Sequence, residues 1–127
     1  MPPLPLRPPL AAVAAALLAA CAGCGEPTPA ALDATPLRLT LSEYRIAPQA
    51  VRIPAGRQTI LVRNDGTMVH RLEIRSADRT RTLAASPPLR PGASARLRVE
   101  LPPGAYVDTC GVERHDTLGE HGSIVVR

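Results

Sequence analysis

Residues 96–110 read RLRVELPPGAYVDTC, and this stretch indicates how the chain folds. Apolar and charged side chains alternate strictly from Arg96 to Leu101, which is the pattern of a β-strand with one buried face. The Pro102-Pro103-Gly104 segment then forms a turn that leads the chain into a second run, residues 105–110. The stretch therefore predicts two short strands joined by a tight turn.

The same texture extends over residues 37–127. Short alternating runs recur, separated by turns such as those at 54–56 and 64–66. No window shows the 3.6-residue period of an amphipathic helix, and only residues 76–91 have the character of a long loop, with at most one short strand or helical turn. We therefore predict an all-β fold, a β-sandwich of seven or so half-buried antiparallel strands. These lie near residues 37–41, 51–53, 60–62, 72–74, 97–101, 105–110 and 123–127.

The composition limits which residue types can form the core and which kinds of partner the protein is expected to bind. The chain has no Phe and no Trp and only two Tyr, so we expect a core of Leu, Val, Ile and Ala. Its formal charge of +4 comes from 15 Arg against 11 acidic residues, with no Lys. The Arg residues are scattered singly and no aromatic side chains lie between them, so nucleic-acid binding is not expected.

The segment 1–20 has the layout of a secretory signal. Arg7 supplies a positive charge, and an unbroken apolar run from Leu10 to Ala20 follows that is too short to span a bilayer. We therefore predict a signal peptide over residues 1–20. The mature protein is expected to be exported, either to a periplasm or to the outer face of a membrane.

Cys21 follows Leu18-Ala19-Ala20 at the end of the apolar run. This resembles the lipobox of bacterial lipoproteins, in which the Cys is lipidated and becomes the mature amino terminus. The resemblance implies a lipid anchor on Cys21; an ordinary signal peptide is the alternative, and Cys24 is a poorer candidate for acylation. Residues 21–36 are rich in Ala, Gly, Pro and Thr, which predicts a flexible tether before a single domain at 37–127.

Cysteine and histidine residues suggest a metal site in this domain. Cys110 and His115 are five residues apart on a predicted loop between two strands, so a thiolate and an imidazole can reach one ion. His70 is at the end of a strand that can approach the same loop. Two imidazoles and one thiolate form the set that suits copper in electron-transfer sites. A bridge between Cys24 and Cys110 is possible but poorly motivated, and metal ligation explains a lone thiol in the domain of an exported protein.

Several motifs resemble those of the cupredoxins, the small blue-copper proteins. Residues 54–56 read PAG, an Asn64 precedes His70 by a few residues, and a Pro-Gly turn and a Tyr precede Cys110. Cupredoxins often end in Cys-x4-His-x4-Met, and the match covers essentially all of residues 37–127. The resemblance implies an eight-stranded Greek-key sandwich. It also implies one copper ion, held by His70, Cys110 and His115, that alternates between Cu(I) and Cu(II).

The chain departs from the cupredoxin pattern near the expected axial ligand. Glu120 stands where the family has Met, and His121 is a competing candidate for that position. A carboxylate is a harder ligand that stabilises Cu(II), so we expect Glu120 to lower the reduction potential and to move the site towards a tetragonal geometry. Asp108 stands where cupredoxins usually have a large apolar residue, and Arg71 stands where many of them have an Asn. An inward Asp108 needs a hydrogen-bond partner, so we expect either that it accepts a hydrogen bond from a ligand His or that the strand is bulged at this position.

These observations predict a lipid-anchored, mononuclear copper protein that transfers one electron at a time to a redox partner the sequence does not specify. We expect a monomer and no enzymatic activity, because no base and oxyanion-donor signature accompanies Cys110 and three His residues cannot supply further copper centres. Two alternatives stay open: a copper-binding or delivery protein without redox duty, and a cupredoxin-fold interaction module without metal.

Overall fold

The computed structural model describes residues 30–31 and 36–127, so the predicted signal peptide and the predicted lipid anchor on Cys21 lie outside the described residues. The described part contains ten strands and no helix. It accordingly contains no helix long and apolar enough to cross a membrane. The strands are β1 (Ala30–Ala31), β2 (Leu37–Ser42), β3 (Arg45–Ala47), β4 (Ala50–Ile53), β5 (Gly56–Asn64), β6 (Leu72–Ser76), β7 (Thr82–Ala85), β8 (Ser94–Leu101), β9 (Gly104–Cys110) and β10 (His121–Val126).

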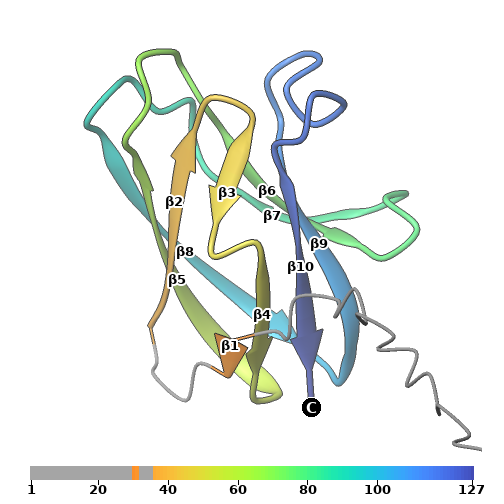
Figure 1. The fold of residues 1–127 in the computed structure, drawn as a ribbon. Coiled ribbons are helices and arrows are strands. Elements are labelled where there is room, and N and C mark those ends of the chain that lie inside the picture. Colours follow the sequence, from red (N-terminus) through yellow and green to blue (C-terminus); the bar gives the residue numbers. More distant parts are fainter. Residues whose placement is uncertain (1–29, 32–35) are drawn as a thin grey trace, which may run out of the picture.

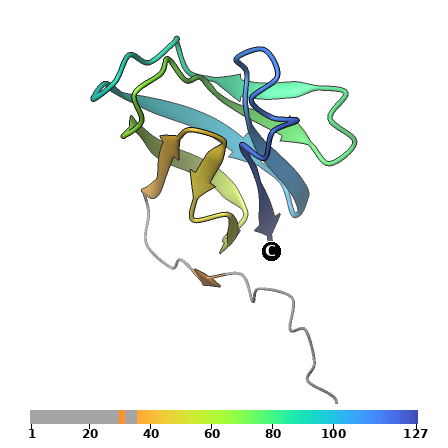
Figure 2. The ribbon, with the colours of Figure 1, turned by 45° about the horizontal axis from the view of Figure 1, so that its top comes forward.

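The strands form two sheets that face one another as a β-sandwich (Figures 1 and 2). One sheet has the order β1-β4-β10-β9-β6-β7 and the other has the order β3-β2-β5-β8. The turn at residues 102–104 joins β8 of the smaller sheet to β9 of the larger one. The predicted sandwich architecture is therefore confirmed, and the stretch from 96 to 110 is one of the places where the chain passes between the two layers.

Strand direction differs from the prediction in part. Most neighbours are antiparallel, but β5 runs parallel to β2, and β4 runs parallel to both β1 and β10. The expectation of antiparallel pairing throughout is wrong at these pairs, because alternation of apolar and polar residues reports burial and not direction. The strands that the alternation missed, β1 and β3, have only two and three residues, too few to show a period. β7 is the short strand expected within residues 76–91.

The core between the sheets is aliphatic, as the composition predicted. Burial alternates along the strands, for example buried, exposed, buried from Leu37 to Leu39. Among the described residues, the half-buried Tyr106 is the one aromatic residue of the apolar set that packs against the core, and its hydroxyl donates a hydrogen bond to the carbonyl of Pro102 at 2.7 Å. The buried apolar residues are Leu37, Leu39, Leu41, Ile46, Val51, Ile53, Ile60, Val62, Leu72, Ile74, Leu89, Leu97, Val99, Leu101, Ile124 and Val126.

Three connections meet at the end of the sandwich opposite the C terminus: the β2–β3 turn, the β5–β6 connection and the β9–β10 loop (Figure 1). Asn64, fully buried at the end of β5, fixes the second of these. Its side-chain amide donates hydrogen bonds to the carbonyls of Met68 at 2.7 Å and Leu89 at 2.8 Å, and its carbonyl oxygen accepts one from the N–H of Gly66 at 2.8 Å. These bonds set the path of the chain immediately before His70.

Candidate metal centre

His70 lies between β5 and β6 and points into the sandwich. Its backbone pairs with Leu89 in both directions, with its N–H donating at 3.0 Å and its carbonyl accepting at 2.7 Å. The side chain is fully buried. The two-way bridge fixes the backbone of His70, and burial leaves its ring little room to rotate.

The β9–β10 loop supplies the other three predicted ligands. Cys110 ends β9, and its N–H donates to the carbonyl of Glu120 at 3.0 Å, while the N–H of Glu120 donates to the carbonyl of His115 at 3.0 Å. Gly119, just before Glu120, has φ of +115°, a backbone conformation that residues with a Cβ rarely adopt. The loop is thus closed by its own backbone bonds, which hold its three ligand side chains at one point.

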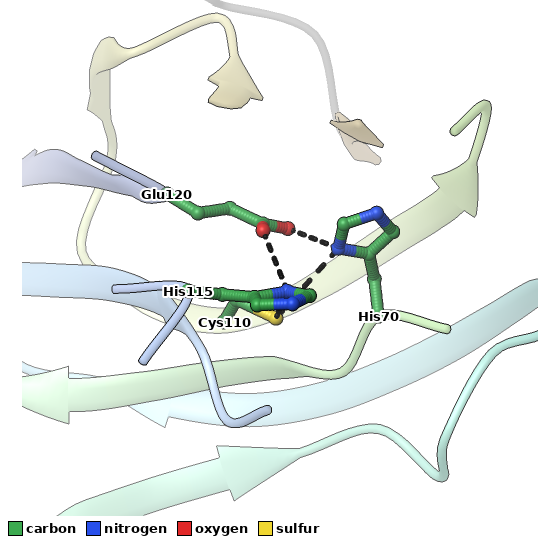
Figure 3. Close-up of side chains that lie close together, drawn as sticks. All are labelled: His70, Cys110, His115 and Glu120. Carbon is green, nitrogen blue, oxygen red and sulfur yellow. Dashed lines mark hydrogen bonds and ion pairs between the residues drawn. The ribbon is translucent and has the colours of Figure 1, made fainter. Parts of the chain in front are cut away.

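The four side chains converge on one small volume (Figure 3). The Sγ atom of Cys110 lies 3.8 Å from Nδ1 of His70 and 3.6 Å from Nδ1 of His115. The carboxylate of Glu120 places Oε1 2.6 Å from Nδ1 of His70 and Oε2 3.2 Å from Nδ1 of His115. All four residues are buried, and one ligand atom from each lies within 4.8 Å of all the others.

This donor set fits a metal ion. Metal bonds of roughly 2.0–2.3 Å at tetrahedral angles separate ligand atoms by roughly 3.3–3.5 Å, close to most of the distances found here. Both carboxylate oxygens of Glu120 are buried, and each faces the Nδ1 atom of a histidine ring without a well-formed hydrogen bond. Burying a carboxylate without a neutralising charge is costly, and a cation between the four side chains offsets that cost.

Burial also shapes the protonation of the group. It raises the pKa of the Cys110 thiol to about 11, an effect that hydrogen bonds from the backbone of Arg71 and Val112 partly offset. It raises the pKa of Glu120 to about 7 and lowers the pKa of His70. Without a metal, burial therefore shifts all three groups towards their neutral forms. Metal binding displaces a proton from the thiol and stabilises the carboxylate, so the affinity of such a site depends on pH.

Two residues beside the ligands were missed by the sequence reading. Glu43, in the β2–β3 turn, places Oε1 3.5 Å from Nε2 of His70. Hydrogen bonds from its own backbone and from the N–H groups of Met68 and Thr67 lower the pKa of Glu43 to about 2. The ring of Tyr44 contacts His115 edge to face, with centroids 5.5 Å apart. No local pattern marks this turn, because its role comes only from contacts across the fold.

Two neighbouring residues lie outside the group. His121, the competing candidate for the axial position, lines a hollow on the surface with Gln49 and Arg79 rather than joining the four ligands. Asp108 is buried, but neither of its carboxylate oxygens has a hydrogen-bond partner among the described residues, and β9 pairs regularly with β6 around it. Both explanations predicted for Asp108, a ligand His as partner and a bulged strand, are therefore wrong.

The fold and the site together define a class: a small β-sandwich with Cys, His and carboxylate side chains gathered at one end. Residues 11–126 match the model of the Cupredoxin-like domain family, and the chain belongs to that family. The resemblance predicted from the sequence is therefore confirmed. No curated protein sequence matches the chain.

Similar solved structures agree on the fold. Reduced auracyanin from the photosynthetic bacterium Roseiflexus castenholzii is 22% identical, with a TM-score of 0.68 over 76% of this chain and 99% of that one. Auracyanin A, a "blue" copper protein from Chloroflexus aurantiacus, is 19% identical, with a TM-score of 0.59 over 71% and 99%. A purple cupredoxin from Nitrosopumilus maritimus is 20% identical, with a TM-score of 0.54 over 72% and 99%.

Proposed function

We propose that this protein is a membrane-anchored, extracytoplasmic copper protein that carries one electron at a time through a mononuclear site. The observation that carries the proposal is the convergence of His70, Cys110, His115 and Glu120, all buried, at one end of a cupredoxin fold. One thiolate and two imidazoles are the donors that electron-transfer copper sites use. Copper, when bound, supplies a reversible one-electron couple.

The protein supplies rigidity and a dry environment. Backbone bonds at His70 and across the β9–β10 loop hold the donor atoms within 4.8 Å of one another, so little rearrangement has to accompany a change of charge. The thiolate of Cys110 favours the softer Cu(I) state, whereas the imidazoles tolerate both states. A carrier needs this combination because electron transfer is slow when ligands must move.

Glu120 adjusts the balance between the two oxidation states. Together with the Cys110 thiolate it places two negative charges in a buried site, which neutralise Cu(II) but leave a net negative charge with Cu(I). A buried, uncompensated charge is unfavourable, so we propose a reduction potential below that of related sites with an axial Met.

The proposed cellular location rests on the amino-terminal sequence. The proposed signal peptide at 1–20 and the lipobox ending at Cys21 support export and attachment to a membrane by a lipid. Mass spectrometry of the protein purified from a bacterial host tests this part. We expect a chain that begins at a lipid-modified Cys21, and a chain without lipid on Cys21 contradicts the proposed anchor.

The second candidate function is copper delivery without redox duty, which the harder donor Glu120 favours. The reduction potential and the electron self-exchange rate of the copper-loaded protein distinguish the two. A reversible couple with fast self-exchange supports the carrier. A slow, irreversible couple supports delivery and contradicts electron transfer.

A further inference from the structure

Glu43 faces the His70 ring from the side opposite the ligand group. Its Oε1 lies 3.5 Å from Nε2 of His70, and this ring atom is buried without a hydrogen-bond partner among the described residues. On the other side of the same ring, Nδ1 faces Glu120 and Cys110. The two nitrogens of His70 therefore face different environments, and the nearest charged group to Nε2 is the carboxylate of Glu43.

Three hydrogen bonds hold Glu43 in this place. Its Oε1 accepts from the N–H of Thr67 at 2.5 Å, the N–H of Met68 at 2.9 Å and the hydroxyl of Thr67 at 3.2 Å. The donors belong to the connection that precedes His70, whereas Glu43 belongs to the β2–β3 turn. The carboxylate is thus attached to the same short segment that carries the ligand, and the two cannot drift apart independently.

Gly66 provides the space for this contact. A Cβ at residue 66 would lie 2.9 Å from Nε2 of His70, and 2.5 and 2.9 Å from the two carboxylate oxygens of Glu43. Such distances are too short for a carbon atom, so any side chain at this position has to push the two groups apart. The absence of a side chain at Gly66 is therefore a steric requirement of the pair.

We propose that Glu43 is a positioning residue for the metal ligand His70, with its carboxylate accepting the proton on Nε2. A neutral imidazole carries one N–H, so a proton held at Nε2 leaves the lone pair of Nδ1 free to bind the ion. The carboxylate also fixes the plane of the ring and makes the imidazole a stronger donor. This inference rests on the proposed function, because it presupposes a metal ion at Nδ1.

A purely structural role for Glu43 has different consequences. If the carboxylate only braces residues 67–68, its loss weakens the fold without changing His70. Asp78 offers a matched control, because it accepts hydrogen bonds from Ser76 and Thr80 in the turn between β6 and β7, and neither partner is a ligand. The variant Asp78→Asn thus removes a carboxylate that braces a turn and touches no ligand.

The test compares the full chain with its Glu43→Gln, Glu43→Asp, Gly66→Ala and Asp78→Asn variants. Competition against a chelator measures the affinity for Cu²⁺. Long-range ¹H–¹⁵N spectra of the Zn²⁺-loaded protein report the chemical shift and solvent exchange of the Nε2 proton of His70. We expect about 10- to 100-fold weaker Cu²⁺ binding and faster exchange of this proton for Glu43→Gln and Gly66→Ala. Glu43→Asp recovers part of the loss, and Asp78→Asn behaves as the unaltered chain.

Two results overturn the inference. The first is Cu²⁺ affinity and Nε2 exchange in Glu43→Gln that equal those of the unaltered chain. The second is lower thermal stability in Glu43→Gln with an unchanged Nε2 signal, which assigns the residue to bracing alone. Failure of the proposed function shows separately, because the unaltered chain then binds no Cu²⁺.

Discussion

Replacing Asp108 by Val is expected to stabilise the protein strongly. The Asp108 side chain is 1% exposed, and neither carboxylate oxygen has a hydrogen-bond partner among the described residues. It lies opposite Ile74 of β6 and Gly122 of β10 in the register of the larger sheet. Val is similar in size and suits a strand, so it fills this position without leaving buried polar atoms unpaired.

The stabilisation by Asp108→Val depends on pH, and burial of the carboxyl determines the direction of this dependence. Burial raises the pKa of Asp108 from 3.8 to about 7. The folded chain therefore keeps a proton that the unfolded chain releases, so the contribution of Asp108 to stability is largest below about pH 4 and declines as the pH rises towards 7. At about 1.4 kcal/mol per pH unit, roughly 3 kcal/mol is lost between about pH 5 and about pH 8.

Even the protonated carboxyl leaves hydrogen bonds unmade, at a cost of about 1–3 kcal/mol. We therefore expect Asp108→Val to raise the free energy of unfolding by about 1–3 kcal/mol below about pH 4, where the carboxyl is protonated in both states. The gain should be roughly 3 kcal/mol larger near pH 8 than near pH 5. Urea unfolding of both metal-free chains at pH 5 and pH 8 measures the difference between their free energies of unfolding. The contributions of all other titrating groups cancel in this difference. Asp108→Asn, which removes the charge but keeps a buried polar group, should give a smaller gain. A Val variant no more stable than the original chain at pH 8 refutes the reasoning.

Three further predictions concern the site and the core. Glu120→Met should raise the reduction potential of the copper protein by at least about 60 mV, a tenfold change in the ratio of Cu(II) to Cu(I) affinity, measured by voltammetry. Gly119→Ala introduces a Cβ at φ +115° and should lower the free energy of unfolding by about 1–3 kcal/mol and weaken Cu²⁺ binding, measured by urea unfolding and chelator competition. Ile124→Ala removes a fully buried side chain between the sheets, so thermal and urea unfolding should show a loss of about 2–5 kcal/mol with an unaltered copper spectrum.

Much of this fold was predictable because its strands have one buried face. Alternation located β2, β4, β5, β6 and β8, since each places apolar side chains in the aliphatic core, and β9 and β10 were expected from the turn at 102–104 and the last run of the chain. Alternation does not reveal which strand pairs with which, so the parallel pairs of β2 with β5 and of β4 with β10 were missed. Strand direction depends on how often the chain crosses between the sheets, which is a property of the whole topology.

The residues of the candidate site were likewise predictable only in part. Cys110 and His115 are close in sequence, and the fixed spacing to Glu120 brought that residue into the prediction. The family resemblance supplied His70, and the structure brings all four side chains together. Glu43 was not predictable, because it is 27 residues from His70 and nothing in the β2–β3 turn differs from an ordinary solvated turn. Asp108 shows the reverse problem: an acidic residue on the buried face of a strand suggests a partner, and the structure shows none among the described residues.

The most direct test of the proposed copper site is the absorption and paramagnetic-resonance spectrum of the copper-loaded chain, recorded beside its Cys110→Ser variant. We predict one Cu²⁺ per chain and an intense visible band from thiolate-to-copper charge transfer. We also predict a resonance spectrum altered from the blue type towards tetragonal geometry by Glu120, and the loss of the visible band in Cys110→Ser. Absence of bound copper, or a visible band that survives in Cys110→Ser, contradicts a site built from His70, Cys110, His115 and Glu120.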